Sequence, residues 1–430
     1  MRFSLGLMAA VAACGTTKNA DVPVGDACTR HPDWSAHPLC TAWVINTDAR
    51  STQITDETGQ GVLTDVQSVF LEQIDGDAYM RVQTSGVPSY QITMIEADVT
   101  ALNDRPLASD DFADGATTAA AGDVIEFGQD IGYENPNCDL GYWPPGPECA
   151  ADAGGDSTFP MVPERADHTD CATGAGVLGR WVSGVAIYGW TDTSSYNNEG
   201  SWNNIAIALE YYDIDVCGGH AGFGGEYHHH GQSECLRALV GDAGTEHSPI
   251  WGFAGDGYPV YGPWHAADVL AETCWKARAY TADSPTGCGE DHKRSCVMVD
   301  PYDPAQGTEP ADNDGPDDNT TVTSMSGNTF DAVSGLYFED HYFDPDCPAE
   351  GAQYLDAHNG HDHDGLGYHY HVTVTLTDAG RFLDKFPMHI GPSYAGELPD
   401  GATSTCGDAA GDLPPDDGPP PDGGPPPGAL

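Results

Sequence analysis

Histidines gather in two segments of this chain and recur there at the same spacing. Each segment reads Asp, three residues, Gly-His, a glycine-containing stretch and then Tyr-His-x-His. The matched residues are Asp215, Gly219, His220, Gly224, Tyr227, His228 and His230 in the first segment, and Asp356, Gly360, His361, Gly365, Tyr368, His369 and His371 in the second. The repeat is visible in this motif only, and its detail predicts that the two segments share one chemical role.

The spacing within each motif suits a transition-metal ion. Successive side chains of a strand point to opposite faces, so the two histidines of a His-x-His unit share one face, about 6 to 7 Å apart along the strand. The glycines of each motif would bring back a third histidine, which completes a three-His site. The predicted ligands are His220, His228, His230, His361, His369 and His371. Imidazole suits Zn, Cu, Ni and Fe, and for an exported protein we expect copper or zinc.

The pattern leaves the arrangement of these ligands open. Each motif could build its own three-His site, or the two strands could pair and pool their ligands into one shared site. A structural role is the alternative, since a lone histidine is usually a hydrogen-bonded core or turn residue. Six histidines at a repeated spacing favour the metal.

Several other residues are candidates for additional roles. His247 and Asp256 lie in a Gly/Pro-rich aromatic segment between the motifs, and His358 and His363 lie within the second motif. Asp362 and Asp364 are candidates to accept hydrogen bonds from the imidazoles. If the site were catalytic, Tyr227, Tyr368 or Asp256 could transfer protons.

A metalloenzyme is the second hypothesis. Three histidines with an open coordination position would lower the pKa of a bound water, or would support copper redox chemistry. The sequence does not decide whether the protein is an enzyme. Calcium is a minor option at an acidic loop that lacks the complete EF-hand pattern, with Asp312, Asp314, Asp317 and Asp318 as its ligands.

The charge balance excludes two classes of partner. The chain has 67 acidic and 15 basic residues, a formal net charge of -52. Such a field repels phosphate backbones, so we predict no nucleic-acid binding, and it also argues against basic patches that dock on anionic lipid. Most of these carboxylates should form a solvated surface. No protein or small-molecule partner can be named from the sequence.

The amino terminus carries an export signal. Arg2 precedes an apolar stretch that is too short to span a bilayer and that ends in Val11-Ala12-Ala13-Cys14, which resembles a bacterial lipobox. We predict a signal peptide over 1–13, lipidation of Cys14 and a tether over 14–42. The protein would then be anchored in the cell envelope by its lipid, or secreted if the signal is an ordinary secretory peptide.

Cysteine usage agrees with export. The chain has 13 cysteines, and an even number remains beyond Cys14, which indicates disulfides. The close pairs Cys28/Cys40, Cys138/Cys149 and Cys288/Cys296 are candidate bridges. No Cys-x-x-Cys pair occurs, so a thiolate zinc site is disfavoured.

Short runs of Val, Ile, Tyr and Thr between Gly, Pro and Asp predict a mainly β fold. We expect one large β-rich domain over 43–392, with long loops and few short helices. The best helical candidate is 266–277. Residues 393–430, which become nearly all Pro, Gly and Asp towards the end of the chain, should form a disordered tail.

The run Tyr368-His-Tyr-His371 is the signature of the YHYH family of bacterial exported proteins, which this chain resembles over roughly 43–392. Further blocks resemble the family too: 86–90, 181–188, 195–196 with Trp202, 215–220, 235–236, 247–249 and 256–263. The resemblance implies an exported protein but names no reaction. Two positions depart from the family: His229 stands where members often have Tyr, which leaves the His-x-His ligands intact. His358 stands where members often have Cys, which puts a disulfide or thiolate role there in doubt and adds an imidazole.

Overall fold

The computed structural model describes residues 25–26, 34–56, 58–104, 117–132, 148–166, 171–211, 214–323, 329–398, 404 and 406. The predicted signal peptide and the lipidation site Cys14 lie outside the described residues, as do Cys28 and Cys138.

The chain is mainly β, as the sequence predicts, and its α-helices in the described part are short. The amino-terminal elements are β1 (Gly25–Asp26), α1 (Pro38–Thr41), β2 (Ser51–Thr55), β3 (Gly61–Leu63), β4 (Val66–Ile74), β5 (Asp77–Thr84), β6 (Gln91–Thr93), α2 (Glu96–Asp104), β7 (Val124–Glu126) and β8 (Gly155–Pro160). The order β1-β4-β5-β8 makes a four-stranded sheet. Its β4–β5 hairpin turns at Asp75 and Gly76, which both have positive φ, as a two-residue hairpin turn requires.

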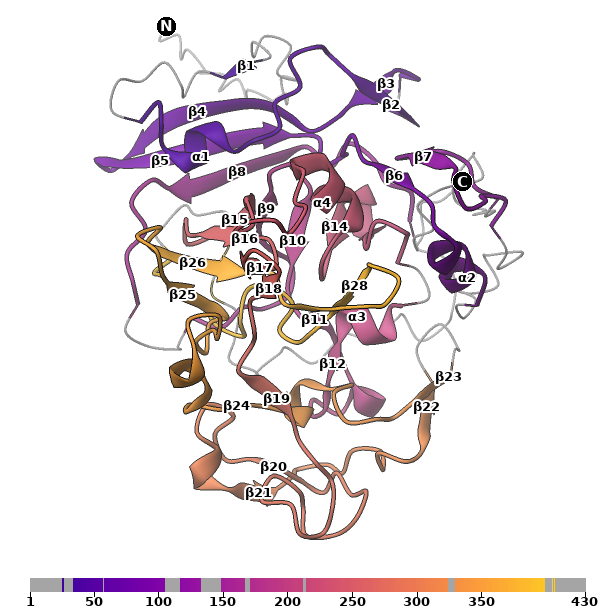
Figure 1. The fold of residues 1–430 in the computed structure, drawn as a ribbon, viewed down its shortest axis with the longest axis vertical. Coiled ribbons are helices and arrows are strands. Elements are labelled where there is room, and N and C mark those ends of the chain that lie inside the picture. Colours follow the sequence, from indigo (N-terminus) through magenta and orange to yellow (C-terminus); the bar gives the residue numbers. More distant parts are fainter. Residues whose placement is uncertain are drawn as a thin grey trace, which may run out of the picture.

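An eight-stranded sheet occupies the middle of the molecule (Figure 1). Its strands are β9 (Val177–Trp181), β10 (Ala186–Tyr188), β13 (His220–Ala221), β14 (Tyr227–His229), β15 (Ile250–Ala254), β16 (Pro259–Tyr261), β25 (Gly360–Asp362) and β26 (Tyr368–His371). They lie in the order β13-β14-β10-β9-β15-β16-β26-β25. Both His motifs therefore lie in one sheet, at its two opposite edges.

This sheet repeats itself about its centre. In each half an antiparallel pair, β9–β10 or β15–β16, is followed by a parallel neighbour, β14 or β26, and by an antiparallel edge strand, β13 or β25. The repeated unit is thus four strands, larger than the motif visible in the sequence. The chain inserts 262–359 between β16 and β25 but only 189–219 between β10 and β13, so no single offset aligns both halves.

The two halves meet closely at β9 and β15, which pair antiparallel. A side chain at Gly179 would place its Cβ 2.1 Å from the carbonyl oxygen of Phe253, and one at Gly252 would place it 2.8 Å from that of Arg180. Only glycine fits at these two positions, because the backbone of the partner strand lies where a side chain would be.

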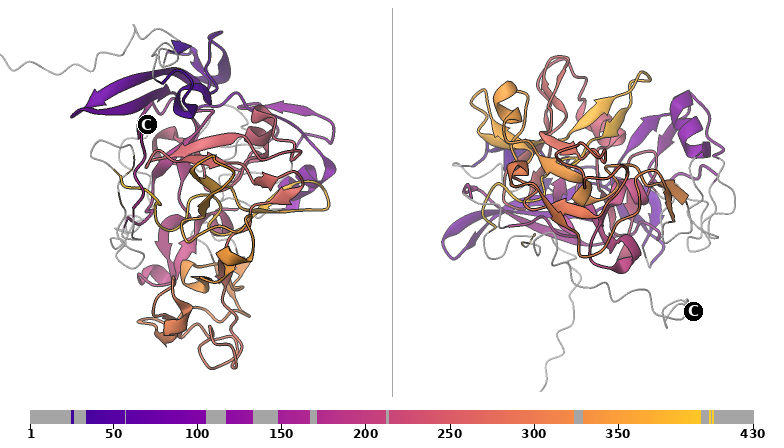
Figure 2. Two further views of the ribbon diagram at one scale, coloured as in Figure 1. Left: turned by 60° about the vertical axis from the view of Figure 1, so that its left-hand side comes forward. Right: turned by 90° about the horizontal axis from the view of Figure 1, so that it is seen from below.

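Smaller hairpins and helices surround this sheet. They are β11 (Thr191–Ser195), η2 (Tyr196–Asn198), β12 (Asn203–Ile205), α3 (Ala206–Leu209), η3 (Phe223–Gly225), α4 (Glu234–Val240), β17 (Trp264–Ala266), β18 (Val269–Leu270), β19 (Trp275–Ala277), β20 (Cys296–Met298), η4 (Pro304–Gln306), β21 (Thr308–Pro310), β22 (Thr321–Thr323), β23 (Thr329–Asp331), η5 (Phe338–Asp340), β24 (His341–Phe343), η6 (Cys347–Glu350), β27 (Val374–Leu376) and β28 (Phe382–Asp384). Much of 262–359 forms the end of the molecule opposite the four-stranded sheet (Figure 2).

The predicted helix over 266–277 is wrong. The segment instead forms part of the β17–β18 hairpin, in which Trp264 pairs with Leu270, and strand β19, in which Trp275 pairs with Phe343 of β24. Val269 and Leu270 pair within the hairpin, and Trp275 pairs with a strand from a distant segment, so tertiary pairing overrides the helical preference of this segment.

The domain extends beyond both predicted boundaries. Leu39 and Cys40 of α1 are buried in the main core, although they lie in the predicted tether. Tyr394 is buried in the same core, although it lies beyond residue 392, the predicted end of the domain. A disulfide joins Cys406 to Cys171. These boundaries were placed by composition, but a few apolar residues and one cysteine suffice to dock a polar segment on the domain.

All ten cysteines in the described part of the chain are disulfide-bonded. The described pairs are Cys171–Cys406, Cys217–Cys235, Cys274–Cys347 and Cys288–Cys296. The predicted bridge Cys288–Cys296 is confirmed. Cys40 and Cys149 are also bridged, but their predicted partners lie outside the described residues. Disulfides in this number are typical of proteins outside the cytoplasm.

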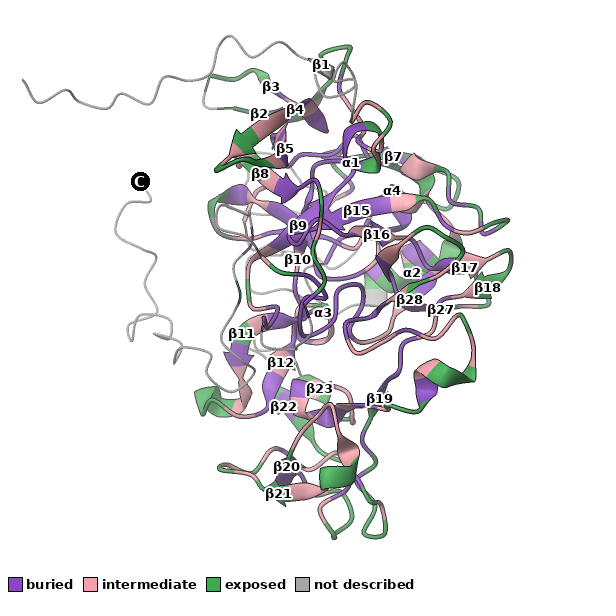
Figure 3. Ribbon diagram, turned by 90° about the vertical axis from the view of Figure 1, so that its left-hand side faces the viewer, coloured by how far each residue is buried: buried purple, intermediate pink, exposed green. Residues whose placement is uncertain are grey.

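The main core lies around the central strands, which are buried in Figure 3, while the end formed by β20 and β21 is more exposed. The described helices include none with the length and apolar character needed to cross a bilayer.

Candidate metal centres

The first motif brings its three predicted ligands together at one edge of the central sheet. His220 on β13 pairs across the hairpin with His228 on β14, and His230 follows two residues later. One ring nitrogen from each of the three lies within 4.8 Å of the other two, and all three side chains are buried. We call this group the first centre.

The hydrogen bonds of two of these rings determine where their protons are. His228 Nδ1 lies 3.0 Å from the carbonyl oxygen of Glu226, and His230 Nδ1 lies 2.6 Å from that of Gly189. A carbonyl oxygen only accepts, so each Nδ1 carries the proton and each Nε2 of the neutral ring has a lone pair. The two Nε2 atoms face each other at 3.2 Å. Two lone pairs at this distance repel unless a cation lies between or beside them.

Glu210 adds an oxygen donor that the sequence reasoning missed. Its Oε2 lies 3.2 Å from His230 Nε2 and 3.5 Å from His220 Nε2. Glu210 follows α3, outside the repeated motif, so no spacing rule pointed to it. Three imidazoles and one carboxylate are a donor set that suits zinc or copper.

The second motif builds the same geometry at the other edge of the sheet. His361 on β25 pairs with His369 on β26, and His371 follows. Nδ1 of His369 donates to the carbonyl oxygen of Gly367 at 2.7 Å, and Nδ1 of His371 donates to that of Gly262 at 2.6 Å. These acceptors occupy the positions of Glu226 and Gly189 in the other half. The three ring nitrogens again lie within 4.8 Å of one another, and we call this group the second centre.

The other residues that the two motifs share hold the ligand strands in place. Asp215 Oδ1 accepts from the backbone N–H groups of Cys217 (2.7 Å) and Gly219 (3.1 Å), and the Tyr227 hydroxyl donates to Oδ2 at 2.7 Å. This carboxylate therefore ties the turn before His220 to the strand that carries His228.

Asp356 repeats the arrangement. It accepts from His358 N (2.9 Å), Gly360 N (3.1 Å) and the Tyr368 hydroxyl (3.0 Å). The glycine before the first histidine is required by the tyrosine: a Cβ at Gly219 or at Gly360 would lie 2.7 Å from Cζ of the tyrosine of its own motif. Tyr227 and Tyr368 therefore position the centres rather than contact an ion.

Burial keeps five of the six ligand imidazoles neutral. Removal from water, reinforced by neighbouring histidines, lowers the pKa of His230 and of His361 to about 3 and that of His369 to about 4. The pKa values of His228 and His371 fall well below the usual range for the same reasons. A neutral imidazole is the form that binds metal, so the ligands are ready at neutral pH.

The two centres are separate. Five strand spacings divide β14 from β26, which is roughly 24 Å. Of the two arrangements that the sequence left open, the structure has each motif forming its own group rather than one pooled site.

Three further histidines surround the second centre. His247 precedes β15, His265 lies on β17, and His363 follows β25. Together with the ligands already named they form two more groups whose ring nitrogens lie within 4.8 Å: His247/His363/His369 and His265/His361/His363. His247 and His363 were candidates from the sequence, whereas His265 was not.

Other sequence candidates lie elsewhere. His358 Nδ1 bonds to Ser393, away from both centres. Asp256 accepts from the Tyr370 hydroxyl at 2.5 Å and from Gly396 N at 2.9 Å, so it is a structural acceptor rather than a ligand or base. Asp364 Oδ2 lies 3.7 Å from His363 Nε2 and is exposed to solvent.

The acidic loop does not gather into a calcium site. Asp317 is paired with Lys293, and Asp318 is paired with His292. Within the part of the chain that the structure describes, the groups of three or more metal-ligating residues consist of histidines alone.

Both departures from the family pattern have a place in the structure. His229 points away from the first centre into the core, where it contacts the rings of Tyr90, Trp181 and Tyr227. His358 occupies the position that corresponds to Cys217, which is bridged to Cys235 in the first half.

Residues 156–346 match the family model described as YHYH protein. This part of the chain is a YHYH domain. The match includes the first motif and strands β9 to β16, while the second motif lies beyond it; it is therefore shorter than the resemblance over 43–392. No protein of curated function and no solved structure matches the chain.

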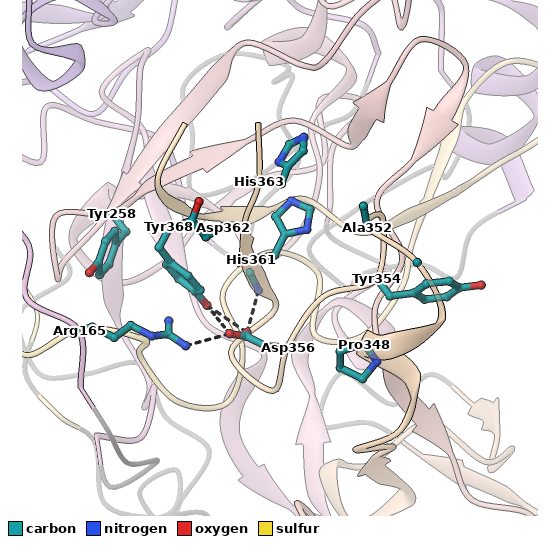
Figure 4. A pocket seen from close by; sticks show the side chains of 12 residues that line it. Arg165, Tyr258, Pro348, Ala352, Tyr354, Asp356, His361, Asp362, His363 and Tyr368 are labelled. Atoms are coloured by element: carbon teal, nitrogen blue, oxygen red, sulfur yellow. Dashed lines mark hydrogen bonds and ion pairs between the residues drawn. The ribbon is translucent and has the colours of Figure 1, made fainter. Parts of the chain in front are cut away.

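A cavity of about 680 Å³ borders the second centre (Figure 4). His361 and His363 lie on its wall, and Arg165 lies beside Tyr368, with the guanidinium carbon 3.8 Å from the ring centre. Arg165 also pairs with Asp356 at 3.0 Å. The second centre is thus reachable from outside, whereas the three ligands of the first are buried.

Proposed function

We propose that this protein is an exported transition-metal-binding protein with two centres, one in each half of the duplicated sheet. The observation that carries the proposal is the pair of facing Nε2 lone pairs of His228 and His230 at 3.2 Å, with both Nδ1 protons held by carbonyl oxygens. A purely structural histidine pair would share a proton between its rings, and here both candidate protons point elsewhere.

The donor sets favour zinc or copper. Hard oxygen-preferring ions such as Ca²⁺ and Mg²⁺ are disfavoured by three imidazoles, whereas Zn²⁺ and copper accept nitrogen donors readily. The disulfides support a place outside the cytoplasm, and lipidation at Cys14 remains part of the proposal.

Metal content tests the proposal. Untagged protein from an export compartment would be analysed by mass spectrometry, beside the double variants His228→Ala/His230→Ala and His369→Ala/His371→Ala. We expect at least two equivalents of zinc or copper, with each double variant losing the metal of its own centre. His229→Phe is the matched control, because this ring lies between the two ligands in sequence but faces the core. A native protein that holds no metal, even after incubation with Zn²⁺ or Cu²⁺, would refute the proposal and leave the motifs structural.

A catalytic role is a second candidate for the second centre alone. The cavity beside His361 and His363 gives an ion there an open side, which a hydrolytic or redox site needs. Activity against chromogenic esters and reducing substrates, lost in His369→Ala/His371→Ala but kept in His228→Ala/His230→Ala, would support it. Equal activity in both variants and in metal-free protein would contradict it.

A further inference from the structure

The second centre differs from the first in the histidines around it. His247, His265 and His363 approach the three ligands of the second centre, whereas the histidine group of the first centre, within the described residues, contains only His220, His228 and His230. The duplication has therefore kept the inner ligands and given one copy an outer layer.

The outer histidines overlap the inner group. The group His265/His361/His363 shares His361 with it, and the group His247/His363/His369 shares His369. His363 belongs to both outer groups and not to the inner one. Its ring centre lies 4.6 Å from that of His361 and 5.3 Å from that of His369.

These groups describe alternative positions of one ion. Two ligand nitrogens on a single Zn²⁺ lie at most roughly 4.2 Å apart, because each Zn–N bond is about 2.1 Å. The six histidines do not form a single group within 4.8 Å, so one ion cannot bind them all at once. Every outer group also needs a ring that the inner group uses, so inner and outer positions exclude each other.

Burial orders these positions from the surface inward. His369 and His371 are fully buried, while His247, His265 and His363 are only partly buried. His361 and His363 line the cavity, and in Figure 4 the two rings lie one above the other on its wall. Neither ring nitrogen of His363 has a hydrogen-bond partner in the described part of the chain. An ion that arrives through the cavity therefore meets His361 and His363 before the buried His369 and His371.

We infer that the outer histidines form a loading site through which a metal ion reaches and leaves the second centre. The inference rests on the proposed function. The ion binds first to an outer group and then exchanges one imidazole at a time, because each outer group already contains a ligand of the inner one. No bond to hydrogen breaks and no electron moves; neutral imidazoles replace one another. The negative surface charge raises the local concentration of the cation. The second centre therefore exchanges its metal ion readily, and the first centre retains its ion.

Zinc exchange kinetics test the loading site. The experiment uses the full chain with His228→Ala/His230→Ala, so that only the second centre binds zinc. The transfer of Zn²⁺ to and from a coloured chelator is followed by stopped flow. In this background we expect His363→Ala to slow both uptake and release at least tenfold, while the equilibrium affinity changes less than about threefold. His292→Ala is the control, since this exposed histidine pairs with Asp318 and belongs to none of the histidine groups.

The outcomes separate this inference from the proposed function. Unchanged rates in His363→Ala, with zinc still bound, would overturn the loading site alone. A His363→Ala variant that loses affinity as strongly as His369→Ala would also overturn it, because His363 would then be a ligand of the resting site. Loss of one of two equivalents in the same variant would replace it by a two-ion cluster. A wild-type chain that binds no zinc would refute the proposed function itself.

Discussion

Removing the Tyr227 hydroxyl should destabilise the fold more than removing that of Tyr368. Tyr227 and Asp215 are buried, and their hydrogen bond is 2.7 Å long. A hydrogen bond to a charged group contributes about 1.5–3 kcal/mol. Asp356 is 30% exposed and also pairs with Arg165, so solvent and the guanidinium replace part of what Tyr368→Phe removes. At pH 8, where Asp215 carries its charge, we expect a loss of about 1.5–3 kcal/mol for Tyr227→Phe and about 0.5–1 kcal/mol for Tyr368→Phe.

The first of these losses should depend on pH. Burial raises the pKa of Asp215 to about 7, against the lowering effect of the Tyr227 hydrogen bond. The folded state therefore retains a proton between the unfolded pKa and about 7, and stability falls as the pH rises through this window. Without the hydroxyl the pKa rises further, and the fall continues to higher pH. The deficit of Tyr227→Phe should thus be larger at pH 8 than at pH 5.5, where Asp215 is protonated in both proteins.

Urea unfolding of metal-free wild type, Tyr227→Phe and Tyr368→Phe at both pH values measures these differences. Comparison with wild type at the same pH cancels the other titrating groups. Equal losses for the two variants, or a Tyr227→Phe deficit that is no larger at pH 8, would refute the assignment of Asp215 and Tyr227 as a buried brace of the first centre.

Three more predictions concern the metal. Burial lowers the pKa values of His228 and His230 so far that zinc should displace no proton from these two rings. Calorimetry in two buffers counts the protons that zinc releases at the first centre, and more than one released per Zn²⁺ at pH 6 would contradict this. Gly360→Ala should abolish metal at the second centre only, because its Cβ would lie 2.5 Å from the His369 carbonyl oxygen; metal analysis that finds both centres filled would count against it. Free Zn²⁺ at a hundred times the Kd should stabilise the fold by about 2.7 kcal/mol per centre, and His228→Ala/His230→Ala should lose one increment; unfolding that ignores zinc would argue against binding to the native state.

The sequence by itself determined the features that are local. The mainly β fold and the shared face of each His-x-His unit follow from strand alternation, which needs no distant contact. The grouping of His220 with His228 and His230 follows from a short hairpin that glycines allow, so the same three residues could be named from spacing. The helix expected over 266–277 failed because its residues take strand partners from other segments.

Only the tertiary structure decided how the motifs relate to each other and to the rest of the chain. The order of strands places them at opposite edges of one sheet and reveals a duplication of four strands. Glu210 and His265 reach the centres from elements without any repeated spacing, and Asp256 proves to be a partner of Tyr370. The physical reason is that these contacts join residues far apart in the chain, and which distant segments meet depends on the packing of the whole sheet rather than on any local pattern.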